Sequence, residues 1–79
     1  MTYVYILRSV ANPERYYIGI TEDLRARLQK HKGGNVTHTS KYAPWAAKTY
    51  IAFSDNERAF AFEKYLKSPS GRAFGKKRL

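Results

Sequence analysis

The sequence predicts an α/β domain, more strictly α+β, in which a small three-stranded antiparallel sheet is flanked by two or three helices. Its 79 residues leave room for one hydrophobic core, and its apolar content of 43% is too high for a disordered chain. Three runs with strand character and three with helix character follow in the order strand, strand, helix, strand, helix, helix. We therefore expect residues 1–79 to form a single domain.

The first two strands are expected to form a hairpin. Residues 2–8 and 15–20 are rich in aromatic and β-branched side chains, and residues 11–14 between them have the composition of a turn. Gly19 interrupts the second strand, and a glycine in that position often marks a bulge or a close backbone approach.

A helix and a loop are expected after the hairpin. Thr21 is a good N-cap, two acidic residues follow it, and the helix is predicted to end near Lys32, before the glycines at 33–34. Residues 35–44 are polar and rich in turn formers, so they are predicted to form a loop.

The second half of the chain repeats the strand-to-helix order. Residues 45–53 have the pattern of a third strand. Ser54 and Glu57 have the spacing of a capping box, which predicts a helix over residues 55–67. The Ser-Pro pair at 68–69 suits the start of a short C-terminal helix.

Positive charge dominates the composition. Fifteen Lys and Arg residues against six Asp and Glu residues give a formal net charge of +9 and a pI near 10.0. Such a surplus is usually neutralised by a polyanion, so nucleic acid is the expected partner. The absence of cysteine excludes disulfides, thiolate zinc sites and cysteine nucleophiles. No apolar run approaches about 18 residues and no signal peptide is evident, so we expect a cytoplasmic protein with no membrane partner.

Glu63 is the acidic residue that local structure explains least. The other five lie at helix starts or in a turn, whereas Glu63 borders the apolar stripe that contains Ala59 and Leu66. A carboxylate in that position can simply pair with Lys64 or Lys67. A lone carboxylate in a basic field is also what one divalent cation on a phosphate backbone requires.

Arg27 and His31 form a second candidate pair. Leu24 and Leu28 mark the buried face of the first helix, and Arg27 and His31 are four residues apart, on nearly one face of it. Arg27 can cover the edge of the core with its stem, and His31 can be a solvated helix end. The functional interpretation is a guanidinium that binds a phosphate beside an imidazole that transfers a proton.

Four of the seven tyrosines lie in the hairpin. Tyr3 and Tyr5 share one strand face while Tyr16 and Tyr17 point oppositely, so at least one of the latter two can share a face with Tyr5. Core packing explains some of these rings. A phenol is also a capable base or hydrogen-bond donor near a metal-held water.

Basic residues are concentrated in two segments, with Tyr42 and Trp45 between them as possible stacking surfaces. Basic segments with interleaved aromatic rings suit single-stranded or distorted nucleic acid, although they can also form a solvated charged face. The candidate nucleic-acid-binding residues are Arg25, Lys30, Lys32, His38, Lys41, Tyr42, Lys67, Arg72, Lys76, Lys77 and Arg78.

Four motifs, taken in order, resemble the GIY-YIG nuclease family. Tyr3-Val4-Tyr5 and Tyr17-Ile18-Gly19, with eleven residues between them, resemble its two-part signature. The segment "TEDLRARLQKH" resembles the next motif, and "FEKYLKS" resembles the motif with the metal-binding glutamate. The spacings match across nearly the whole chain, and the tail "GRAFGKKRL" is similar to that of small stand-alone bacterial members.

The resemblance implies hydrolysis of a phosphodiester with Mg²⁺ or Mn²⁺. By position it makes Tyr5 and Tyr17 the motif phenols, Arg27 the phosphate-stabilising arginine, His31 the neighbouring proton-transfer group and Glu63 the metal ligand. Tyr5 would then orient or deprotonate the attacking water, with help from His31, while Arg27 neutralises the developing charge.

Gly19 matches the glycine that lets the backbone turn at the site. The sequence departs from the family pattern in two places. Tyr3 and Val4 replace the glycine and isoleucine of the first motif, and no asparagine follows Asn56, where some members place one near the C-terminus.

We therefore expect a metal-dependent endonuclease acting on nucleic acid, with DNA as the favoured substrate. The alternatives are a nucleic-acid-binding module that does not cut and a subunit of a larger repair or recombination complex. A homodimer would suit cleavage of both strands, and a larger protein partner would suit a nuclease without a targeting domain.

Overall fold

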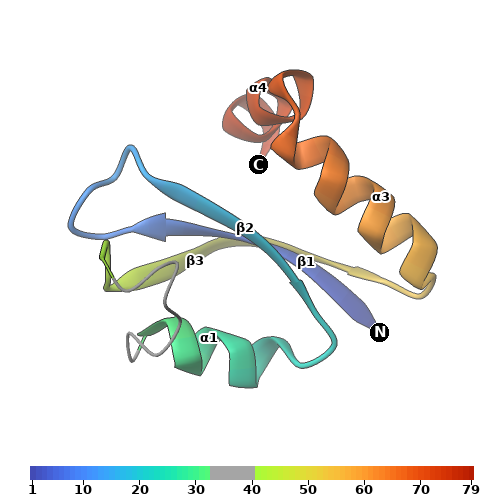
Figure 1. The fold of residues 1–79 in the computed structure, drawn as a ribbon, viewed down its shortest axis with the longest axis horizontal. Helices are drawn as coiled ribbons and strands as arrows, with labels where there is room; N and C mark the ends of the chain where they lie inside the picture. Colours follow the sequence, from blue (N-terminus) through green and yellow to red (C-terminus); the bar gives the residue numbers. More distant parts are fainter. Residues whose placement is uncertain (33–40) are drawn as a thin grey trace.

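The computed structural model describes residues 1–32 and 41–79, and it arranges them as a three-stranded sheet with helices on both faces (Figure 1). The sheet has the order β2-β1-β3, and both pairs of neighbours are antiparallel. The predicted fold is therefore confirmed. The elements are β1 Thr2–Ser9, β2 Tyr16–Thr21, α1 Leu24–Lys32, β3 Trp45–Phe53, α3 Asn56–Lys67 and α4 Pro69–Arg78. Within the described ranges, no helix is both long and apolar enough to span a membrane.

The middle strand β1 divides the interior into two cores, because its side chains alternate between the two faces of the sheet. Val4 and Ile6 pack with the α3 residues Ala59 and Leu66. Tyr5 and its neighbours form the other core, which α1 covers. Figure 1 shows α1 on one side of the sheet and α3 with α4 on the other.

The α1 core consists of Tyr5, Leu7 and Trp45, with Leu24 and Leu28 of α1 packed against them. Trp45 is 5% exposed. Its prediction as a stacking surface for nucleic acid is wrong, because the hydrophobic effect places the indole under α1.

The N-caps differ from those predicted by one or two residues. Asp23, not Thr21, caps α1, since its Oδ1 accepts from the backbone N–H of Ala26. Asp55, not Ser54, caps α3 by accepting from two backbone N–H groups of the first turn. The C-terminal helix begins as predicted, with Ser68 as the cap and proline in its first turn.

A bulge in β3 changes the pairing between β1 and β3. Ile6 pairs with Thr49 but Leu7 pairs with Ala47, which leaves Lys48 as the extra residue. A bulge of this kind bends a strand and redirects a side chain. The Lys48 ammonium consequently lies 5.3 Å from the ring centroid of Tyr16 on β2.

Candidate active site

Tyr5 lies at the centre of the sheet, and the backbone opposite it leaves room for its ring. Tyr5 is 0% exposed, and its register partner on β2 is Gly19. A Cβ atom at position 19 would overlap the hydroxyl and Cζ of Tyr5. Glycine is needed here because of this close approach, as one of the two sequence interpretations held. The expectation of a backbone turn at Gly19 is wrong, because the residue sits within the β1–β2 ladder.

His31 meets the Tyr5 hydroxyl from the last turn of α1. Its Nε2 lies 3.0 Å from the hydroxyl oxygen, and the ring is 1% exposed. The interpretation of His31 as a solvated helix end is therefore wrong. Burial, followed by the charge of Arg27, lowers the pKa of His31. Burial, reinforced by Tyr17, raises the pKa of Tyr5. Both groups are thus uncharged at neutral pH, and the phenol is the donor in the tautomer that has its proton on Nδ1.

Arg27 stands beside this hydrogen bond, one helical turn before His31. It is half-buried, and the i, i+4 spacing places it on the same face of α1 as predicted. Its charge and a hydrogen bond to Tyr5 partly offset the rise that burial causes in the Tyr5 pKa. A guanidinium in this position supplies a fixed positive charge at the edge of an otherwise uncharged aromatic cluster.

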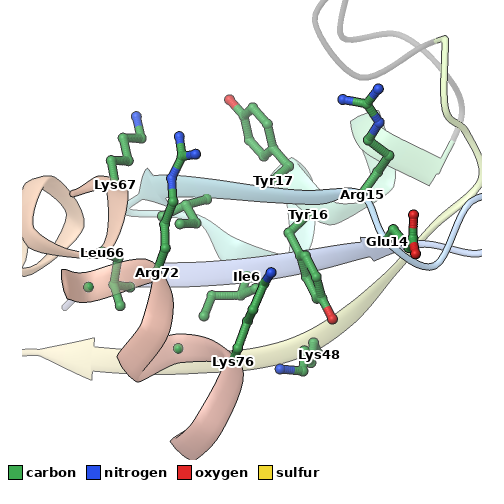
Figure 2. A pocket seen from close by; sticks show the side chains of 13 residues that line it. Ile6, Glu14, Arg15, Tyr16, Tyr17, Lys48, Leu66, Lys67, Arg72 and Lys76 are labelled. Carbon is green, nitrogen blue, oxygen red and sulfur yellow. The ribbon is translucent and has the colours of Figure 1, made fainter. Parts of the chain in front are cut away.

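Tyr17 connects the aromatic cluster to the surface. It lies on the edge strand β2 and is half-buried. Its ring centroid is 6.3 Å from that of Tyr5 and 5.0 Å from that of His31. In Figure 2 its hydroxyl points away from the sheet, to the same side as the Lys67 side chain. Tyr17 and Arg27 therefore offer polar groups to a surface-bound molecule, whereas Tyr5 is covered.

Glu63 lies outside this cluster, on α3, across the sheet from α1. Its side chain is 16% exposed, and its Oε2 forms an ion pair with the Lys67 ammonium. The structure thus contains the Glu63–Lys67 ion pair, which was the structural alternative in the sequence analysis. In the described ranges, no three His, Asp or Glu side chains gather as a metal site. A cation held at Glu63 would therefore complete its shell with oxygens from water or from a substrate.

The profile described as the GIY-YIG catalytic domain matches residues 1–78. The chain belongs to the GIY-YIG family. The resemblance inferred from the four motifs is confirmed, and the match extends over both sides of the sheet and over α4.

Two relatives of this GIY-YIG chain carry the name "Structure-specific endonuclease subunit SLX1". The protein of Debaryomyces hansenii is 36% identical, over 84% of this chain and 21% of its own length. The protein of Candida dubliniensis is 37% identical, over 80% of this chain and 24% of its own length. The chain therefore spans only about a fifth to a quarter of the length of these curated relatives.

The predicted nucleic-acid-binding residues are distributed over several surfaces of the GIY-YIG domain. Exposed side chains project from α1, from the segment before β3, and from α3 and α4: Arg25, Lys30, Lys32, Lys41, Lys67, Arg72, Lys76, Lys77 and Arg78. His38 lies outside the described residues. Tyr42 is half-buried against the α1 core, and the cations of Arg15 and Lys41 lie 4.8 and 5.5 Å from its ring centroid.

Sequence reasoning did not select three residues that line a hollow of this GIY-YIG domain on the α3 side of the sheet. Arg15, Tyr16 and Lys48 line it together with Tyr17, Lys67, Arg72 and Lys76 (Figure 2). A lysine within an otherwise apolar strand was the one available signal for Lys48. The residues that line the hollow come from four separate segments, so no local sequence pattern predicts it.

Proposed function

We propose that this chain is a metal-dependent endonuclease that hydrolyses phosphodiester bonds in DNA. The observation that carries the proposal is the match of the whole GIY-YIG domain, in which the motif residues Tyr5, Tyr17, Arg27 and His31 form one cluster. The net charge of +9 fits a polyanionic substrate.

Arg27 and Tyr17 are the proposed contacts to the reacting phosphate and to the attacking water. A guanidinium suits phosphate oxygens because it is planar, permanently charged and rich in donors. Tyr17 reaches the surface, so its hydroxyl can orient a water molecule next to that phosphate. Beneath them, the Tyr5 hydroxyl and His31 Nε2 share a hydrogen bond, so Nε2 of the Nδ1–H tautomer is placed to receive the phenolic proton. The contacts thus divide the cluster into a surface layer of Arg27 and Tyr17 and a buried layer of Tyr5 and His31.

Glu63 is the proposed ligand for Mg²⁺ or Mn²⁺. Its carboxylate is a hard oxygen donor of the type both ions prefer, and the Lys67 ammonium already occupies it as a monovalent cation would. The chemistry of the donor therefore fits. A divalent ion there would supply positive charge for the leaving oxygen. With one protein carboxylate, affinity without substrate should be weak.

The names of the relatives support a more specific substrate. We propose a branched or otherwise distorted DNA, because both relatives are called structure-specific endonucleases. Both are also called subunits, which supports assembly with a larger protein partner as well as a homodimer.

A binding module that does not cut is the second candidate function. One observation favours it: Lys67 neutralises the carboxylate that would hold the metal. The two candidates differ in what Glu63 does, so that residue decides between them.

The test compares Glu63→Gln with Glu57→Gln, the same change at an exposed position of the same helix. Both proteins are incubated with labelled duplex, single-stranded and branched DNA, in Mg²⁺, Mn²⁺ or chelator. We expect the parent and Glu57→Gln to cut branched DNA with metal, and Glu63→Gln to bind it without cutting.

Equal cutting by all three proteins would remove Glu63 as the metal ligand. Binding without cutting by the parent, for every DNA and either metal, would establish the binding module instead. The loss of the Glu63–Lys67 pair itself should cost only about 0–1 kcal/mol, so unfolding should not complicate the comparison.

A further inference from the structure

A hollow of about 520 Å³ lies between the β1–β2 hairpin and α4 (Figure 2). It opens on the sheet face opposite His31, because Ile6 and Ile18 at its base belong to the core under α3. Ligand pockets in proteins have volumes of about 300–1,000 Å³, so this one is large enough for a small organic group such as a nucleotide.

The base of the hollow is apolar and lies close to the helix backbone. Ile6, Ile18 and Leu66 line it, together with Gly71 and Gly75 of α4. A Cβ atom at Gly71 would collide with the carbonyl of Tyr65 in α3, so the helices meet there without a side chain between them. Gly71 therefore lets α4 pack directly on α3, and Gly75 leaves room for a Cβ beside Leu66.

Tyr16 forms an aromatic wall of the hollow. The residue is 36% exposed, and the cations of Arg8 and Lys48 lie 5.8 and 5.3 Å from its ring centroid. An exposed tyrosine with neighbouring cations is the combination that binds a nucleobase and its phosphate, since the ring stacks on the base while the cations neutralise the charge.

The rim of the hollow is strongly basic. It carries one carboxylate, from Glu14, and five cations, from Arg15, Lys48, Lys67, Arg72 and Lys76. These cations come from the hairpin turn, β3, α3 and α4, so the fold gathers them from four segments. In residues 1–32 and 41–79, only Lys67 of the five forms an ion pair with a carboxylate. A concave surface lined by one sign of charge attracts the opposite charge.

We propose that this hollow binds one unpaired nucleotide of the substrate, with its base on the apolar floor beside Tyr16 and its flanking phosphates on the basic rim. The proposal rests on the proposed function, which makes nucleic acid the substrate. A single base fits between Tyr16 and α4, whereas a base pair in a duplex keeps its faces stacked on its neighbours and cannot enter.

The position of Tyr17 relates the hollow to the site of cleavage. Tyr17 lines the hollow and also packs against His31, so it belongs to both. A DNA strand that leaves the hollow over the edge strand β2 therefore passes the aromatic cluster. The unpaired nucleotide would lie close to the bond that is cut, which would select DNA with an unpaired position over a regular duplex.

The first test measures base contact directly, in chelator, so that no cutting is needed. The probe is a DNA duplex with one unpaired 2-aminopurine, whose fluorescence falls when it stacks on an aromatic ring. We expect the parent to quench it and Tyr16→Leu to lose the quenching. The affinity of Tyr16→Leu should fall by about 5-fold to about 150-fold, the usual value of one base–aromatic stack. The control is Tyr50→Leu, an exposed tyrosine on the other face of the sheet, which should quench like the parent.

The second test measures the phosphate contacts through the salt dependence of binding to the same probe. Lys76→Gln should lower the slope of log K against log [salt] by about 0.7, the value for one phosphate of a single strand. Lys64→Gln removes the same charge from an exposed position of α3 that does not line the hollow, and should leave the slope as it is.

Quenching that persists in Tyr16→Leu, or equal slopes for the two lysine variants, would overturn the proposal. Circular dichroism of each variant shows whether it has folded. Because these tests need no catalysis, their outcome is independent of the outcome of the nuclease assay. A parent that cuts DNA but does not quench 2-aminopurine refutes the hollow alone, whereas quenching by a parent that never cuts refutes the endonuclease alone.

Discussion

Replacing Gly19 with alanine should disturb the site through one added methyl group. The new Cβ would overlap the hydroxyl and Cζ of Tyr5 and lie 2.8 Å from its Cε1. The Tyr5 ring cannot move aside without cost, because it is fully buried and forms a hydrogen bond with His31. Either the ring or strand β2 must therefore move.

The expected cost follows from two opposing contributions. Overpacking a well-filled core costs typically about 1–3 kcal/mol, and weakening the Tyr5–His31 hydrogen bond adds about 1 kcal/mol. Alanine in a strand recovers about 0.5–1 kcal/mol relative to glycine. The net loss should be about 1–3 kcal/mol, and each kcal/mol lowers the Tm of a domain of this size by about 4–8 °C.

Thermal unfolding followed by circular dichroism measures this loss, and DNA cleavage measures its effect on the site. Gly75→Ala is the control, because its Cβ would meet only Leu66 Cδ2, at an ordinary 3.9 Å. It should melt at or above the Tm of the parent, since alanine favours a helix. The cost of Gly19→Ala should also shrink when Tyr5 is replaced by leucine. A Gly19→Ala protein with the Tm and cleavage rate of the parent would show that the ring does not occupy this space.

Three further predictions concern the cluster and the carboxylate. Tyr5→Phe should lower the free energy of unfolding in urea by about 0.5–1.5 kcal/mol, because the hydrogen bond between the Tyr5 hydroxyl and His31 Nε2 is lost. The pKa of His31 is lowered from 6.5, so the unfolded chain binds more protons than the folded chain just below that pH. Stability should therefore decrease as the pH falls through 6.5. Thermal melts at several pH values measure this, and His31→Gln should remove the dependence. Lys67→Met should shift the Mn²⁺ dependence of cleavage to lower concentration, because the ammonium no longer competes for Glu63; an unchanged metal titration would contradict the competition.

Local patterns in the sequence predict most helices and strands of the fold, but they do not predict the residue at which each helix begins. Strand β3 occupies Trp45–Phe53 as predicted, because apolar and β-branched residues end there at clear turn signals. The caps were misassigned where several capping residues adjoin, as at Ser54 and Asp55, since each of them can accept from the first turn. Only the three-dimensional path of the chain selects one.

The site was predictable to the extent that helical spacing and motif order determine it. The spacing of Arg27 and His31 places them on one face of α1, and the structure confirms this. Which tyrosine joins them depends on strand register, and the pairing of Leu7 with Tyr17 places Tyr17 on the face of Tyr5. The burial of His31 depends on how α1 packs on the sheet, which no local pattern contains.

The aromatic cluster has a consequence for how such domains diverge. Tyr5 and His31 are parts of a hydrophobic core as well as of the candidate site, so a lineage that stopped cutting DNA would still be constrained to retain them for folding. Glu63 carries no such constraint, because its pairing with Lys67 at the edge of α3 contributes little to stability. In a descendant that binds DNA without cutting it, mutation should therefore remove the carboxylate before the aromatic residues. A domain that has all the other motif residues but lacks this glutamate would then be one that has lost nuclease activity.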